Sequence, residues 1–232
     1  PGTVIAHSPK ETGRYLGSPS IVILPNGNYV AKLDVFGSKT TSDTTQVFVS
    51  SDRGKTWEQQ TEIVGQFWST LFVYERDLYL IGTDKRFGNV TIRKSLDGGR
   101  SWTNPTSPTS GCLLSGGHFH CAPVPVIEHK GRIWMALEKH DPHEGWCWNM
   151  RPFVISVPVN TDFLNASNWT VSEYYPIFDQ SWRNLLVTEK EKEASNAEQH
   201  PNFMSTSGWL EGNVVTTPAG ELVNILRIQE PY

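Results

Sequence analysis

The 232-residue sequence has little of what several protein classes require. Its 3 cysteines are an odd number without C-x-x-C spacing, so we expect neither a disulfide framework nor a cysteine zinc site. Its 20 Lys and Arg do not outnumber its 24 Asp and Glu, which argues against a nucleic-acid partner. No stretch approaches the roughly 20 apolar residues of a membrane helix. The chain starts at Pro1, so we expect a leader or preceding region to have been removed.

Aromatic residues and glycine are abundant by contrast. The chain contains 9 Trp and 19 Gly, and 38% of its residues are hydrophobic. Many aromatics combined with many tight turns suit short, twisted strands. The composition therefore favours a globular all-β protein with enough apolar residues for one sizeable core.

Two octets of the form S-x-D-x-G-x-S/T-W organise the chain, at 50–57 and 95–102, and their first residues lie 45 positions apart. That period matches one four-stranded propeller blade. An Asp carboxylate can accept backbone N–H groups of its own turn, and Gly supplies the positive φ. We therefore assign a structural role to both octets. The assigned residues are Ser50, Asp52, Gly54, Trp57, Ser95, Asp97, Gly99 and Trp102. Residues 165–169 (NASNW) are a weaker third copy.

Four segments read as an apolar strand, a short turn and a second apolar strand. They span 21–33, 70–83, 124–137 and 214–226. A charged residue stands seven positions after the last turn residue in all four segments. Because the two ends of an antiparallel hairpin meet, each of these charged residues should lie near a residue that precedes the first strand of its hairpin. The predicted pairs are Ser18 with Asp34, Trp68 with Asp84, His120 with Glu138, and Glu211 with Arg227.

Propeller blades radiate from one axis, so these eight residues should converge on one rim of the central channel. The result would be a polar pocket with an aromatic wall, which suits a sugar. Isolated charges at strand ends are usually solvated, and only their recurrence in four segments favours a site. His118 and His120 share one face if their segment is extended, but no third ligand stands at a known spacing. We therefore predict no metal and no cofactor.

The octets, and the sequence from Tyr15 through Glu211 as a whole, resemble the Asp-box, or BNR-repeat, proteins of the sialidase-like family, including uncharacterised bacterial exo-sialidase-like proteins. The resemblance implies an all-β, six-bladed β-propeller and a secreted or periplasmic location. On this reading residues 1–232 form a single domain with about four recognisable blades, incomplete at the C-terminal end. The charged stretch within 173–207 is then an insertion between the third and fourth blades.

The family resemblance also implies roles for individual residues. Glu211 matches a Glu that pairs with the family's nucleophilic Tyr, and Arg227 matches an Arg that grips the substrate carboxylate. Gly17 stands where the family carries the first arginine of its triad. The nearest candidates for the family's acid/base Asp are Asp34 and Asp43.

Three functions remain open from the sequence. The first is a glycoside hydrolase acting on a terminal, possibly acidic, sugar, with Asp34, Glu138 and Glu211 as candidate carboxyl groups. The second is a polysaccharide lyase on uronates, with His120 as the base and Arg227 neutralising the uronate. The third is a non-catalytic glycan-binding propeller, which the missing first arginine favours. In each case the partner is carbohydrate, and the oligomeric state stays open.

Overall fold

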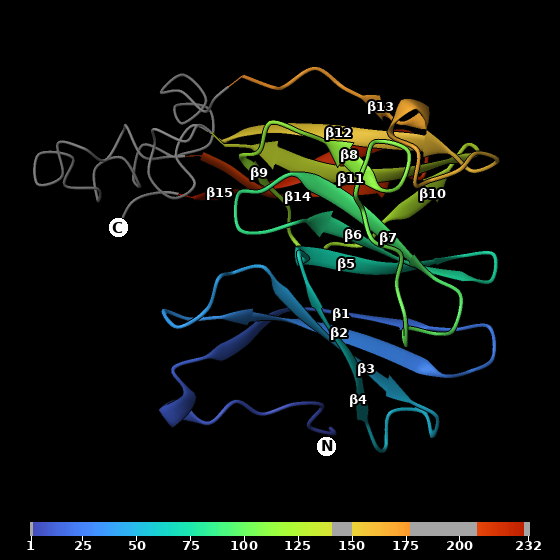
Figure 1. The fold of residues 1–232 in the computed structure, drawn as a ribbon. Helices are drawn as coiled ribbons and strands as arrows, with labels where there is room; N and C mark the ends of the chain where they lie inside the picture. Colours follow the sequence, from blue (N-terminus) through green and yellow to red (C-terminus); the bar gives the residue numbers. More distant parts are fainter. Residues whose placement is uncertain (1, 141–149, 177–207, 230–232) are drawn as a thin grey trace, which may run out of the picture.

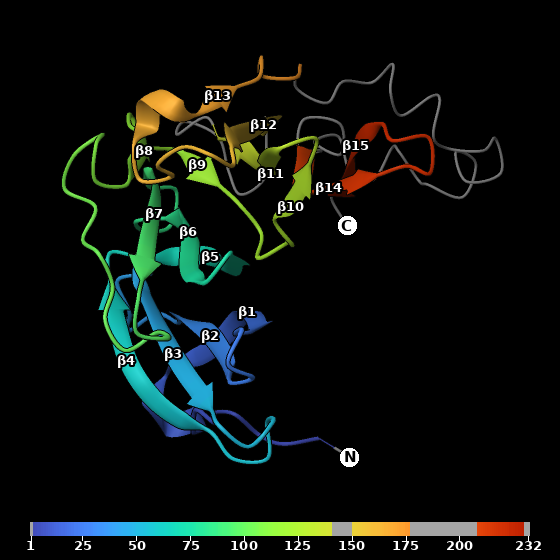
Figure 2. The ribbon, with the colours of Figure 1, turned by 90° about the vertical axis from the view of Figure 1, so that its right-hand side faces the viewer.

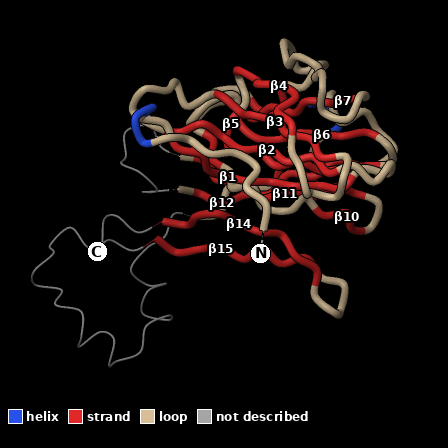
Figure 3. The backbone as a smooth tube through the Cα atoms, turned by 90° about the horizontal axis from the view of Figure 1, so that it is seen from below, coloured by secondary structure: helices blue, strands red, loops and turns tan. Residues whose placement is uncertain are grey.

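The computed structural model describes residues 2–140, 150–176 and 208–229, and its regular structure is almost entirely β-strand (Figure 1). The described strands form four antiparallel sheets (Figure 3). Two short 3-10 turns, η1 (Lys10–Thr12) and η2 (Ala166–Asn168), are the helical segments in this part of the chain. The predicted all-β class is confirmed. Within the described ranges no helix has the length and apolar character needed to cross a bilayer.

Each sheet uses consecutive segments of the chain. The first sheet comprises β1 (Tyr15–Ile23), β2 (Tyr29–Phe36), β3 (Thr44–Ser50) and β4 (Glu58–Val64). The second comprises β5 (Phe67–Tyr74), β6 (Asp77–Thr83), β7 (Val90–Ser95) and β8 (Cys112–Leu114). The third comprises β9 (Phe119–His120), β10 (Ile127–His129), β11 (Arg132–Lys139), β12 (Arg151–Pro158) and β13 (Thr170–Val171). The fourth has β14 (Gly208–Thr216) and β15 (Leu222–Gln229) as its described strands.

The four sheets follow one another around an arc, with β1, β5, β10 and β14 on its inner side (Figure 2). This is the arrangement expected of propeller blades, in which each sheet packs its faces on its neighbours. The six-bladed ring stays a prediction. From residue 177 onward, the predicted insertion over 173–207 lies outside the described residues, and so do residues 141–149.

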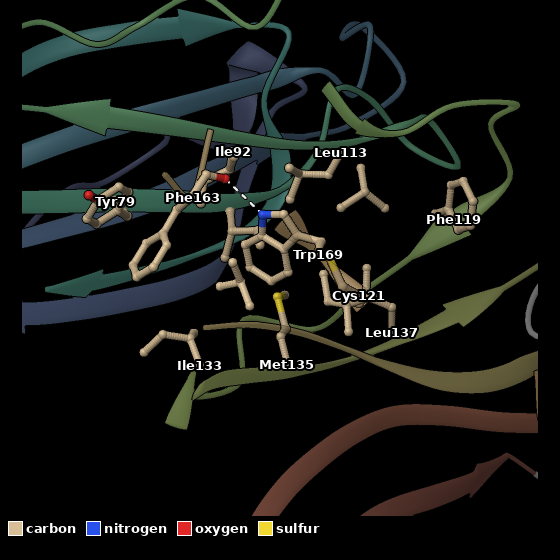
Figure 4. Packing of buried hydrophobic residues seen from close by; sticks show 14 of the residues in the cluster. Tyr79, Ile92, Leu113, Phe119, Cys121, Ile133, Met135, Leu137, Phe163 and Trp169 are labelled. Atoms are coloured by element: carbon tan, nitrogen blue, oxygen red, sulfur yellow. Dashed lines mark hydrogen bonds between the residues drawn. The ribbon is translucent and has the colours of Figure 1, made fainter. Parts of the chain in front are cut away.

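Apolar residues of the second and third sheets form the largest core cluster (Figure 4). Strand β6 contributes Ile81 to this cluster and Leu80 to the cluster on its other face; both are fully buried, because neighbouring sheets cover both faces of the second sheet. Trp169 closes the cluster from the turn before β13, and its indole N–H donates to the Phe163 carbonyl oxygen at 2.8 Å. A smaller cluster joins the first sheet to the second.

The inner strands β1, β5 and β14 each contain a β-bulge at the equivalent place. Ser18, Trp68 and Glu211 occupy it with φ values of 47°, 44° and 54°, in the left-handed region that side-chain-bearing residues seldom adopt. A bulge re-aims a side chain away from the sheet's regular alternation. In the third sheet the inner strand is broken instead, and Pro123 and Pro125 lie between β9 and β10. Proline lacks the N–H that a continuous strand needs.

Both octets form the predicted turn, between β3 and β4 and between β7 and β8. In each copy the Ser hydroxyl bonds the Asp carboxylate, which accepts two backbone N–H groups, and the Trp indole donates to a glycine carbonyl oxygen. The weaker copy at 165–169 occupies the same place between β12 and β13, as η2. The structural assignment therefore agrees with the observed hydrogen bonds.

Candidate functional site

A pocket of about 330 Å³ lies at the ends of the strands where β1 begins and β2 ends. These strand ends are on the left of Figure 1. We call it the rim pocket. Its lining includes all three bulge residues, Ser18, Trp68 and Glu211, together with His120. Four of the eight predicted site residues therefore meet there, three of them because equivalent bulges aim their side chains at the same rim.

Glu211 and Arg227 form the predicted pair. The Arg227 Nη1 atom lies 3.1 Å from Glu211 Oε2, and both side chains remain partly exposed. Leu210 pairs with Arg227 in the register of β14 and β15, so the bulge that follows Leu210 places Glu211 beside the arginine. Arg227 is not itself a lining residue of the rim pocket, but its ion pair joins it to Glu211, which is.

His120 and Glu138 also meet as predicted, but the carboxylate is enclosed. The His120 Nδ1 atom lies 2.7 Å from Glu138 Oε2, and Glu138 Oε1 accepts the Gly212 backbone N–H at 2.8 Å. The Trp68 ring packs edge-on against the imidazole with centroids 4.5 Å apart. Glu138 is 0% exposed, so its predicted role as a catalytic carboxylate is corrected to that of a support behind His120.

Gly212 explains how β14 comes so close to β11. A Cβ atom on Gly212 would lie 2.9 Å from the Ala136 Cβ, closer than real Cβ atoms approach one another. With no side chain there, the Gly212 N–H reaches the Glu138 carboxylate. Glu138 thus holds the histidine of the third sheet and the bulge of the fourth sheet in one hydrogen-bonded unit.

Asp34 is likewise buried beneath the rim rather than facing the pocket. Its Oδ1 atom accepts the Lys32 Nζ at 3.0 Å and the Thr45 hydroxyl at 2.6 Å. Burial raises the pKa of Asp34 and lowers the pKa of Lys32, while the opposite charge of each partner counteracts both shifts. Gly17 pairs with Asp34 in the register, so Ser18 lies beside it as predicted. The catalytic role predicted for Asp34 does not fit its 0% exposure.

Asp84 does not occupy the position predicted for it. Thr83, not Asp84, pairs with Phe67 at the end of the hairpin. The prediction counted Asp77 as a turn residue, whereas it is the first residue of β6. Asp84 instead accepts the backbone and side-chain N–H groups of Asn89, at 2.8 and 2.9 Å, and so closes a loop. The prediction that Asp84 pairs with Trp68 and lines the pocket is therefore wrong, because the pairing position falls one residue earlier, on Thr83.

Several lining residues were missed by the sequence reading. Tyr15 and Phe36 stack with centroids 5.4 Å apart and extend the aromatic wall, and Arg86 adds a cation. Cys121 follows His120 and occupies the third-sheet equivalent of the bulge position, which a corrected register would have found. Its thiol donates to the Trp68 carbonyl oxygen at 2.8 Å, and burial, with the Glu138 charge adding to it, raises its pKa. Within the described ranges, no group of three or more metal-ligating side chains forms.

Neither a protein-family model nor a curated protein matches the sequence. Solved structures do match it in fold. An α-L-arabinanase from Penicillium chrysogenum, complexed with arabinobiose, superposes with a TM-score of 0.54 at 14% identity over 92% of this chain and 57% of its own. A protein of unknown function from Dyadobacter fermentans gives 0.57 at 17% identity, covering 94% and 63%. An α-L-arabinofuranosidase from Fusarium graminearum, with an iminosugar inhibitor, gives 0.55 at 11%, covering 92% and 56%.

At these identities the likeness shows the fold alone, and the chain is an all-β, β-propeller-like protein. It spans between 56% and 63% of the length of the three structures just named. The two of these structures with a named activity are an arabinanase and an arabinofuranosidase, so the sialidase-like family and its six blades are not shown.

Proposed function

We propose that this protein is a glycoside hydrolase that removes a sugar from the end of a glycan, with the rim pocket as its sugar site. The observation that carries the proposal is the meeting of Glu211 and His120 with Trp68 in one pocket at the strand ends. Aromatic rings bind the apolar faces of sugars, and the ionisable groups provide acid and base. Two glycosidases of arabinose-containing substrates share the fold, which supports glycan hydrolysis over unrelated chemistry.

Glu211 is the one carboxylate among the described residues that line the pocket. In the proposed reaction, protonated His120 gives its proton to the glycosidic oxygen as the bond to the anomeric carbon breaks. Glu211 takes a proton from the water that attacks that carbon. Most glycosidases use two carboxyl groups for these steps, and here the imidazole, backed by Glu138, takes the place of one. Arg227 orients the Glu211 carboxylate.

The chemical class of the terminal sugar, acidic or neutral, is a further part of the proposal. Arg86 at the pocket supports the acidic terminal sugar implied by the sialidase resemblance. Gly17, in place of an arginine, and the arabinobiose held by the Penicillium enzyme support a neutral sugar. The substrate panel must therefore contain a 4-nitrophenyl α-L-arabinofuranoside, a β-galactoside and a sialoside.

Glu211→Gln and His120→Gln test the proposal. We expect each to lower kcat/KM on the active substrate by at least about a hundredfold, the usual contribution of a general acid or base, with binding retained. Glu221→Gln is the matched control, because Glu221 is exposed at the opposite end of the same sheet. Full activity of Glu211→Gln would overturn the assignment. Glycan binding by the parent protein without turnover of any glycoside would favour a non-catalytic propeller.

A uronate lyase is the second candidate, and the buried Glu138 behind His120 favours it, because a carboxylate-held imidazole suits proton abstraction beside a carbonyl. Arg86 would then neutralise the uronate. A lyase product contains a new carbon–carbon double bond and absorbs ultraviolet light, whereas a hydrolase product does not. Absorbance appearing on uronate polymers alone would select the lyase.

A further inference from the structure

A second cleft, of about 570 Å³, lies at the opposite ends of the strands from the rim pocket. The β1–β2 turn at this end is on the right of Figure 1. There the β1–β2 turn of the first sheet meets the octet of the second sheet. We call it the turn cleft. The residues that matter for its chemistry are Leu24, Asn26 and Asn28 from the first sheet, and Arg76, Leu96 and Arg100 from the second.

The second octet differs from the first at three positions that line this cleft. The replacements are Leu96 for Ser51, Gly98 for Arg53 and Arg100 for Lys55. The hydrogen-bonded skeleton of the turn is the same in both copies. A Cβ atom at position 98 would crowd Leu24, at 3.3 Å from its Cδ1. Because Gly98 has no side chain, this space at the cleft wall stays open. Turn formation therefore does not require the leucine or the arginine of the second copy.

The charge of the turn cleft is positive. Arg100 is anchored, because its Nη1 donates to the Asp97 carbonyl oxygen at 2.8 Å. Arg76 is exposed and makes no ion pair within the described part of the chain. Partial burial raises the pKa of Asp97, but hydrogen bonds from Ser101 and Ser95 outweigh it and lower the pKa to about 2. The lining of the cleft thus contains two guanidinium groups and one carboxylate, whose oxygens already accept hydrogen bonds from its own turn.

We propose that the turn cleft binds a sugar unit carrying a carboxylate or sulfate group. Guanidinium groups bind such oxyanions by paired hydrogen bonds. The 78% exposed Leu96 offers an apolar surface for a sugar ring, and the asparagine side chains suit hydroxyl groups. The volume fits a ligand of one or two sugar units. A glycan that is already bound at one of the two sites would have a raised effective concentration at the other site, so the two contacts together would bind it more tightly.

Calorimetric titration with a uronate disaccharide, a neutral disaccharide and inorganic sulfate tests the proposal. We expect the uronate disaccharide to bind, and Arg76→Gln and Arg100→Gln each to weaken it by about tenfold. Lys55→Gln, the matched change in the first octet, should leave affinity within about twofold. Tyr15→Ala, which removes an exposed ring from the aromatic wall of the rim pocket, should do the same, which separates this site from the rim pocket.

Unchanged affinity in both arginine variants would overturn the site. Equal affinity for the neutral disaccharide would overturn the role of the anionic group. Sulfate binding as tight as that of the uronate disaccharide would overturn the role of the sugar. Because turnover at the rim pocket is measured separately, loss of one proposal leaves the other standing.

Discussion

Replacement of Glu138 tests how two sheets are joined under the rim pocket. A carboxylate accepts hydrogen bonds, and that of Glu138 lies between His120 Nδ1 and the Gly212 backbone N–H. Glu138→Ala removes both acceptors inside a buried region. Each unsatisfied buried donor costs about 1–3 kcal/mol, so we expect the free energy of unfolding to fall by about 2–6 kcal/mol.

Glu138→Gln separates folding from catalysis. Its amide oxygen can still accept the Gly212 N–H, and its amide nitrogen then faces His120 Nδ1. The imidazole must turn an unprotonated Nδ1 toward it and loses the negative charge that stabilises its cationic form. We expect about 1–3 kcal/mol lower stability, but a fall in kcat of at least about tenfold with little change in KM.

Urea unfolding and steady-state kinetics measure both variants. Glu128→Gln is the control, since Glu128 is exposed on β10 of the same sheet and should change stability by less than about 0.5 kcal/mol. A Glu138→Ala protein within about 1 kcal/mol of the parent would refute the bridging role. Parent-like kcat in Glu138→Gln would refute its role in orienting His120.

Three further changes have defined outcomes. Asp34→Asn leaves the Lys32 ammonium buried without its counter-charge and should lower the free energy of unfolding by about 3–5 kcal/mol in urea; Lys32→Met added to it should recover most of that loss. Hydrogen bonds from Thr56 lower the pKa of Asp52 from 3.8 to about 2, so its stabilisation is complete above about pH 4 and lost toward pH 2. The thermal midpoint of Asp52→Asn should therefore fall less steeply than that of the parent across this range. Gly212→Ala forces β14 away from β11 and should cost about 1–3 kcal/mol, measured by the same urea unfolding.

The repeat pattern predicted much of the fold because its signals are local. The octets at 50–57 and 95–102 became turns at equivalent places, since each turn closes on its own residues. The four hairpins formed, and three of the four predicted rim pairs lie together. The error at Asp84 came from a turn shorter by one residue, which shifts the counted position by one.

Burial at the candidate site was not predictable in this way. Asp34, Glu138 and Glu211 look alike in the sequence, yet two are fully enclosed and one lines the pocket. The bulge at Glu211 turns that side chain out of the sheet, whereas Asp34 and Glu138 lie in regular strands whose faces are covered by neighbouring sheets.

The sequence by itself determined that the chain folds into successive antiparallel sheets and, in three of the four hairpins, which two residues meet at the rim, because strand alternation and turn formation depend on neighbours along the chain. Only the tertiary structure decided which charged groups face a ligand and which serve as supports. That choice depends on the packing of one sheet against the next, where Lys32 reaches Asp34 and the Gly212 N–H reaches Glu138. The turn cleft has the same origin, since its two arginines meet the first sheet only where the two sheets pack together.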